Sequence, residues 1–179
     1  MKWSEKISAF LLLLSLPCAA AEAAEITVSA AMSLRAPFEE IANVFSKTRK
    51  GDRVCLNFAS SGVLEKQIEG GAPVDLFASA SPDEMDMLGQ KGLIISALRR
   101  DFAGNSIVVI TPLRLPAAVR TLRDLEKKGV QRIVIGNPAT VPAGKYAQEI
   151  LKKAGLWSAV QEKTVFAEHV RQIMDYVSR

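Results

Sequence analysis

The stretch Leu56–Ala80, LNFASSGVLEKQIEGGAPVDLFASA, contains the pattern that decides the fold. A short apolar run stops at Ser60-Ser61-Gly62, a helical pattern follows to Gly70-Gly71, and a second apolar run covers Val74 to Ala78. This order predicts a β-α-β unit. At the turn after its first strand, free backbone N–H groups, serine hydroxyls and the positive end of a helix converge, and such a point attracts an anion.

The same construction occurs upstream, where Ile26-Thr27-Val28 leads into Ala30-Ala31-Met32-Ser33-Leu34. Ser33 is a suitable N-cap for a helix, and the spacing predicts one apolar stripe on that helix, formed by Leu34, Phe38, Ile41 and Phe45. Two strand-to-helix turns that face each other would form a pocket.

The rest of the chain continues the alternation of strands and helices. Ser81-Pro82-Asp83-Glu84 predicts a capping box, with Ser81 as a cap and nothing more. Further on, the pattern predicts strands at 107–110, 133–135 and 164–166 and helices at 121–128, after Val141-Pro142-Ala143-Gly144 and after His169. Alternation of this kind implies an α/β fold with parallel sheets, and we expect two lobes, residues 25–105 and 106–179.

Residues 1–24 are typical of a secretory signal peptide. Lys2 and Lys6 precede an apolar block from Ile7 to Leu16, and small residues follow to Ala24. The alternative of a buried N-terminal helix is less well matched, and Pro17 argues against a lipid anchor on Cys18. A chain that starts after residue 24 would keep Cys55 alone, so we expect no internal disulfide, and no other segment is apolar enough to insert in a membrane.

Composition and motifs exclude several classes of function. The net charge is +4, aromatic residues make up 6% and no basic run exceeds two residues, so nucleic-acid binding is not expected. Sequence signatures of nucleotide, zinc and hydrolase sites are absent, and a single histidine does not predict a metal site or a cofactor. A small serine hydrolase that uses Ser33 or Ser61 with His169 remains an alternative, since all three lie at predicted strand-to-helix turns.

Four predicted helix starts follow strands, and none of them carries a charge: Ser33, Ser61, Ala143 and Val170. A fully deprotonated oxyanion offers only acceptors and needs only donors, whereas phosphate keeps a proton near pH 7 and gains from a nearby carboxylate. The sequence therefore favours molybdate, tungstate or sulfate over phosphate as the ligand.

At these residues the chain resembles the periplasmic molybdate-binding proteins of bacterial ABC importers. The matching segments cover residues 25–179 in the family's order: Ala30–Leu34, Phe58–Ser61, Ile68–Phe77, Gly104–Ser106, Gly136–Pro138, Val141–Ala147 and Glu168–Arg171. The resemblance implies a two-lobed periplasmic-binding-protein fold (type II-like) with the oxyanion between the lobes and an ABC transporter permease as partner. It also implies that Ser33 and Ser61 each give a hydroxyl and a backbone N–H, and that Ala143 and Val170 each give a backbone N–H.

The chain departs from the family at two places. His169 stands where members usually carry Asp or Asn, and the family continues beyond the position of Arg179 with a strand whose tyrosine hydroxyl also reaches the oxyanion. Tyr176 is not its equivalent. The resemblance therefore implies that the C-terminal part of both lobes is missing, and it leaves open the alternative of a truncated remnant without effective binding.

Overall fold

The computed structural model describes residues 24–113 and 119–178 of the chain. The predicted signal peptide, residues 1–24, lies outside this range except for its last residue. Among the described residues, no helix combines the length and the apolar character that a membrane crossing requires.

The first sheet is parallel and has the strand order β2-β1-β3. Strand β1 (Glu25–Ala31) pairs along its whole length with β2 (Arg53–Ala59), and its Val28–Ala30 segment pairs with β3 (Leu76–Ala78). The β-α-β unit predicted from residues 56–80 is confirmed. Parallel pairing places the carboxyl ends of all three strands at one edge of the sheet.

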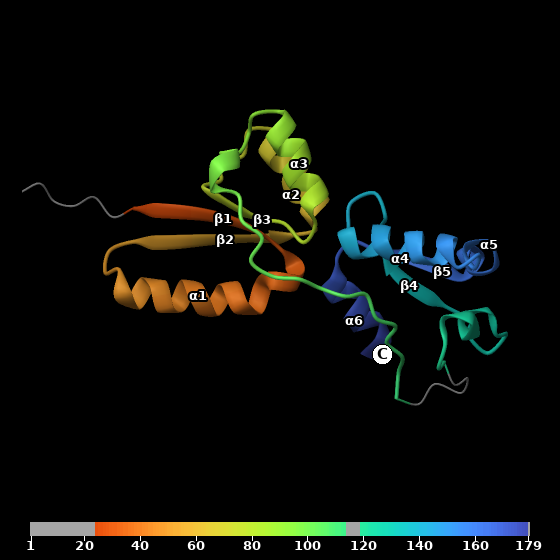
Figure 1. Cartoon of the computed structure of the whole chain (residues 1–179). Coiled ribbons are helices and arrows are strands. Elements are labelled where there is room, and N and C mark those ends of the chain that lie inside the picture. Colours follow the sequence, from red (N-terminus) through yellow and green to blue (C-terminus); the bar gives the residue numbers. More distant parts are fainter. Residues whose placement is uncertain (1–23, 114–118, 179) are drawn as a thin grey trace, which may run out of the picture.

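Helices cover both faces of this sheet. Helix α1 (Arg35–Thr48) lies on one face, and α2 (Ser61–Glu69) and α3 (Pro82–Gln90) lie on the other (Figure 1). Leu34 and Phe38 pack against the core of the sheet, but Ile41 is 59% exposed. The predicted apolar stripe therefore packs against this core only through its first two residues, and both of them are half-buried.

Two details of the predicted helix caps are wrong. Ser33 lies in the 3-10 helix η1 (Met32–Leu34), and the N-cap of α1 is Leu34, so the Ser33 hydroxyl does not cap this helix. Ser81 does cap α3 by accepting from the backbone N–H of Asp83 at 3.1 Å, but the Glu84 carboxylate accepts from the Ser79 hydroxyl. The reciprocal arm of the expected capping box is therefore absent.

The second sheet consists of the parallel strands β4 (Ile133–Gly136) and β5 (Thr164–Ala167). Helix α4 (Pro142–Lys153) packs on β4, α5 (Trp157–Val160) and η4 (Gln161–Lys163) follow it, and α6 (Val170–Ser178) contacts both strands. A separate core gathers under α4 and α5, formed by Leu125, Leu151, Leu156 and Val160. Both strands and both long helices agree with the sequence prediction.

The segment between the two sheets contains no strand in its described part. Beyond α3, its described residues form only the 3-10 helices η2 (Ser96–Leu98) and η3 (Leu122–Glu126), and η3 is shorter than the helix predicted at 121–128. The strand predicted at 107–110 is wrong: Ile107–Ile110 make no backbone hydrogen bond with any residue that the structure describes, and Val108 is 71% exposed. An apolar, β-branched run forms a strand only where another strand offers a free edge beside it, and the described residues offer none there.

Candidate functional site

The four helix starts singled out from the sequence line one cavity of about 350 Å³. Ser33 and Ser61 come from the first sheet and its helices, and Ala143 and Val170 come from the second. The cavity lies at the carboxyl ends of the first sheet's strands, since Ala31 is the last residue of β1, Ser60 comes directly after β2, and Ala80 lies just beyond β3. The position is the one that parallel α/β sheets favour for ligands.

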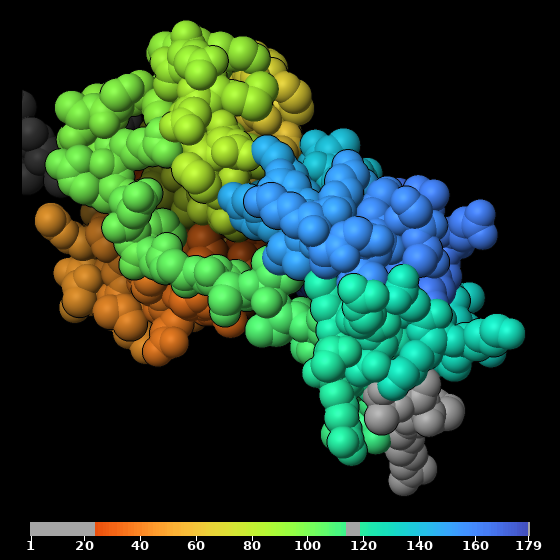
Figure 2. Space-filling model, turned by 45° about the vertical axis from the view of Figure 1, so that its right-hand side comes forward, coloured from red at the N-terminus to blue at the C-terminus, as the bar shows by residue number. Residues whose placement is uncertain are grey.

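Three contacts join the two parts of the structure around this cavity. The backbone N–H of Gly62 donates to the carbonyl oxygen of Thr140 at 3.1 Å, Lys145 forms an ion pair with Asp83, and α6 contacts η1. In Figure 2 the yellow-green region of the surface, which includes α3, lies against the blue region, which includes α4. Both parts of the chain therefore line the cavity.

The two serines of the first part present donors in different ways. The Ser61 hydroxyl oxygen accepts from the backbone N–H of Ala80 at 2.9 Å, so its own hydrogen is left to donate. Ser61 is fully buried at the first residue of α2. Ser33 is exposed in η1, and its hydroxyl has no hydrogen-bond partner among the described residues.

The two helix starts of the second part present backbone donors. Ala143 is the second residue of α4 and Val170 is the first residue of α6. Neither N–H has a backbone acceptor within the described residues, as is usual for the first turn of a helix. Gly144 allows α4 to lie this close to β4, because a Cβ at position 144 would come within 1.9 Å of the Gly136 carbonyl oxygen.

The cavity wall is uncharged. Among the described residues that line it there is no Asp, Glu, Lys or Arg. The ion pair of Lys145 with Asp83 belongs to a neighbouring cavity of about 210 Å³. The arrangement therefore offers N–H and O–H donors and no carboxylate acceptor.

Some polar residues of the cavity were not singled out as ligands from the sequence: Ser60, Asn105, Tyr146 and His169. The Ser60 hydroxyl is buried and has no hydrogen-bond partner in the described structure, although Ser60 is the N-cap of α2. The sequence does place Ser60 and His169 beside predicted sites. Asn105 and Tyr146 lie in segments that match the family, but neither lies at a predicted strand-to-helix turn, and only the folded chain brings them to the cavity.

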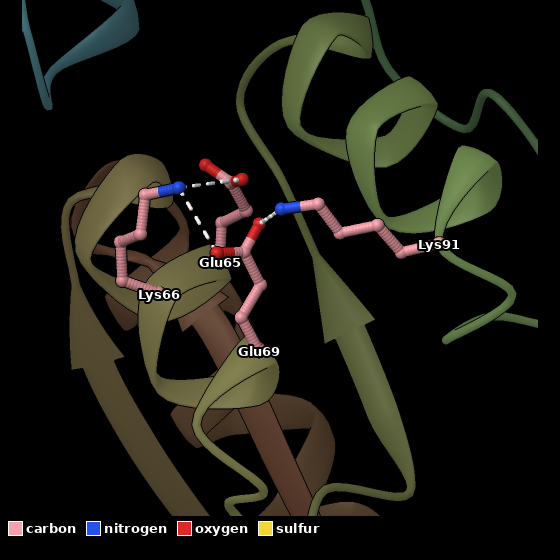
Figure 3. A network of polar contacts seen from close by, with 4 residues as sticks. All are labelled: Glu65, Lys66, Glu69 and Lys91. Atoms are coloured by element: carbon pink, nitrogen blue, oxygen red, sulfur yellow. Dashed lines mark hydrogen bonds and ion pairs between the residues drawn. The ribbon is translucent and has the colours of Figure 1, made fainter.

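The neighbouring cavity contains a buried carboxylate, Glu65. Figure 3 shows Glu65 beside Lys66 and Glu69, with Lys91 reaching Glu69 from the other side. Burial, followed by a hydrogen bond with the Glu69 side chain, raises the pKa of Glu65 above its ordinary value. Hydrogen bonds from Lys91 and Lys66 lower the pKa of Glu69 to about 2. The surroundings of Glu65 therefore disfavour its ionised form, whereas the surroundings of Glu69 favour its ionised form.

The residues of the suggested hydrolase do lie at one cavity, but they are not hydrogen-bonded as a catalytic group. His169 Nδ1 accepts from the backbone N–H of Gln172 at 3.1 Å, and within the described residues no hydrogen bond joins His169 to Ser33 or Ser61. A nucleophilic serine needs a base within hydrogen-bond reach and a third group that orients the base. The described residues do not supply this arrangement.

Comparison with known proteins identifies the family. The family described as "Bacterial extracellular solute-binding protein" matches residues 26–179. The chain belongs to this family. An α/β chain with a cavity between two sheets is what such a solute-binding protein requires.

Similar members of the solute-binding family include proteins named for molybdate. The "Molybdate-binding protein ModA" of Haemophilus influenzae is 35% identical over 184 residues, which cover 100% of this chain and 72% of the relative. The protein of the same name from Escherichia coli K12 is 40% identical, with 90% of this chain and 64% of the relative covered. The "Putative ABC transporter substrate-binding lipoprotein YvgL" of Bacillus subtilis is 37% identical, with 85% and 58% covered. The chain thus spans between about three fifths and three quarters of these relatives.

Two solved structures share the fold. The substrate-binding domain of a putative molybdenum ABC transporter from Clostridium difficile has a TM-score of 0.60 at 34% identity, with 87% of this chain and 67% of that chain covered. The periplasmic molybdate-binding protein of Azotobacter vinelandii has a TM-score of 0.67 at 24% identity, with 86% and 66% covered, and at this identity it supports the fold alone. The expected α/β periplasmic-binding-protein fold is confirmed.

Proposed function

We propose that this solute-binding protein captures molybdate, or the similar tungstate, in the periplasm and delivers it to an ABC transporter permease. The observation that carries the proposal is the meeting of Ser33, Ser61, Ala143 and Val170 at one uncharged cavity. Relatives that are named as molybdate-binding proteins support the same ligand. The signal peptide at residues 1–24 belongs to this proposal as the route to the periplasm.

The chemistry of the cavity wall favours a fully deprotonated dianion. Each oxygen of molybdate accepts hydrogen bonds, and the donors that line the cavity are hydroxyls and free N–H groups of helix starts. Phosphate near pH 7 also carries an O–H that needs an acceptor, and a carboxylate is absent from the described wall. Selection against phosphate would follow from this missing acceptor.

Capture would proceed by closure of two lobes, residues 25–105 and 106–179. Each proposed lobe contributes two of the four donors, so only the closed state brings all of them to the anion. A ligand shifts a conformational equilibrium by its difference in affinity for the two states, and here that difference is the second pair of donors. Closure would also form a binding surface for the permease that the open, unliganded protein lacks.

We propose that the protein does no chemistry on its ligand. The hydrogen bond from Gln172 N–H occupies the Nδ1 of His169, which a catalytic carboxylate would otherwise orient. Turnover of an ester that is lost in Ser61→Ala would contradict this part of the proposal.

Thermal melts and calorimetric titrations with molybdate, tungstate, sulfate and phosphate test the proposed ligand. At 100-fold excess over Kd, a bound anion should add about 2.7 kcal/mol to the free energy of unfolding. We expect this gain with molybdate and tungstate, a smaller gain with sulfate and none with phosphate. Strongest binding of phosphate would overturn the ligand assignment, and the absence of any anion effect would favour a chain without effective binding.

Two serine variants provide a matched comparison. Ser61→Ala removes a hydroxyl donor of the cavity and should weaken molybdate binding about tenfold to one hundredfold, since hydrogen bonds to charged groups contribute about 1.5–3 kcal/mol. Ser81→Ala removes an N-cap outside the cavity, so it should lower stability by about 1 kcal/mol and leave affinity unchanged.

A further inference from the structure

His169 lies between β5 and α6 and lines the cavity. Its Nδ1 accepts from the backbone N–H of Gln172 at 3.1 Å, an N–H that also donates to the His169 carbonyl oxygen at 3.1 Å. The Gln172 side chain in turn accepts from the backbone N–H of Glu168 at 2.7 Å. The two side-chain hydrogen bonds form a reciprocal cap at the start of α6, with an imidazole nitrogen in the role that an Asn or Asp oxygen usually has. The ring is therefore fixed by its Nδ1 edge.

This cap decides which ring nitrogen carries hydrogen. A nitrogen that accepts a hydrogen bond has no hydrogen of its own, so the neutral imidazole of His169 carries its hydrogen on Nε2. Within the described residues, Nε2 has no hydrogen-bond partner, and no ion pair includes His169. The second part of the chain thus has an uncommitted neutral N–H donor on a residue of the cavity wall.

We propose that the Nε2–H of His169 donates to the bound oxyanion and adds to the donors named above. This inference rests on the proposed function. The donor is neutral, as are the others, and it comes from the same helix start as the free N–H of Val170. Two donors from one turn would hold neighbouring oxygens of a tetrahedral anion.

Substitution separates the donor from the cap. In His169→Asn, the side-chain oxygen can still accept from the Gln172 N–H, but nothing replaces Nε2–H. We expect the melting temperature of the free protein to stay the same and molybdate affinity in calorimetry to fall about tenfold. His169→Ala removes both groups and should lower the melting temperature as well as the affinity.

The outcomes distinguish this inference from the proposed function. If the unsubstituted protein gives no titration with molybdate, the proposed function is wrong. If it binds molybdate and His169→Asn binds equally tightly, the donor role of His169 is wrong and the proposed function stands.

Nuclear magnetic resonance gives an independent readout, because His169 is the single histidine of the chain. In protein labelled with ¹⁵N-histidine and made without a histidine tag, we expect the Nε2–H tautomer before any anion is added. Saturation with molybdate should shift the Nε2 signal and slow the exchange of its proton with water. A hydrogen on Nδ1 in the free protein, or an Nε2 signal that molybdate does not change, would overturn the proposal.

Discussion

At the scale of single residues, the network in Figure 3 contains two carboxylates, Glu65 and Glu69, whose pKa values shift in opposite directions on folding. Folding raises the pKa of Glu65, so its ionised form is less favourable in the folded protein than in the unfolded chain. This penalty is present at neutral pH and disappears as the pH falls below the ordinary value of 4.5. We expect Glu65→Gln to raise the free energy of unfolding by about 1 kcal/mol at pH 7, with the gain fading in acid. Urea denaturation between pH 7 and pH 4 measures it.

Glu69 is the matched control, because its pKa moves the other way. Folding lowers this pKa to about 2, so the ionised side chain stabilises the folded protein above pH 4.5, and that contribution is lost as the pH falls toward 2. Glu69→Gln should therefore be less stable than the unsubstituted protein at pH 7, and the difference should shrink in acid. If both substitutions changed the free energy of unfolding at pH 7 in the same direction, the interpretation of the network would be wrong.

At the scale of elements, the close packing of α4 on the end of β4 decides where one wall of the cavity lies. A Cβ at Gly144 would lie 1.9 Å from the Gly136 carbonyl oxygen, which the backbone cannot tolerate without moving the helix. Gly144→Ala should lower the free energy of unfolding by about 3 kcal/mol and displace the N–H of Ala143. Chemical denaturation and molybdate titration check the two effects.

Gly70 offers the comparison for this element. It follows α2 with a negative φ of −75°, and a Cβ there would approach nothing closer than 3.4 Å. Gly70→Ala should therefore change stability by less than about 1 kcal/mol and leave the cavity intact. A similar loss in both variants would show that close packing at Gly144 is not the cause.

At the scale of the whole molecule, the ion pair of Lys145 with Asp83 joins α4 to α3 beside the cavity. Both side chains are almost half exposed, so the pair should contribute less than about 1 kcal/mol to overall stability. Because it links the two proposed lobes, we expect a larger effect on closure. Lys145→Met should weaken molybdate binding up to about fivefold in calorimetry.

Asp83→Asn separates closure from simple attraction of the anion. If the pair acts by holding the closed state, both variants weaken binding and both expand the liganded protein in small-angle scattering. If Lys145 acts only as a positive charge near a dianion, Asp83→Asn strengthens binding while Lys145→Met weakens it. The second pattern would contradict a role in closure.

Much of the fold and of the candidate site followed from local sequence patterns. Helix starts after short apolar runs predicted both parallel sheets and drew attention to Ser33, Ser61, Ala143 and Val170, which the structure brings to one cavity. The run Ile107–Ile110 was misinterpreted, because a strand depends on a partner edge far away in sequence. Asn105 and Tyr146 were missed for a related reason, since neither lies at a strand-to-helix turn.

The sequence by itself determined the five strands, the helices that follow them, their parallel order and the uncharged character of the helix starts, because turns, caps and apolar spacing act over a few residues. Only the tertiary structure decided that helix starts from both sheets share one cavity, that the Ser61 hydroxyl oxygen accepts from the N–H of Ala80, and that His169 Nδ1 accepts from the N–H of Gln172. Each of these depends on which group lies opposite a given atom. Which groups come into contact depends on the packing of segments that are distant in the sequence, and a local sequence pattern does not predict that packing.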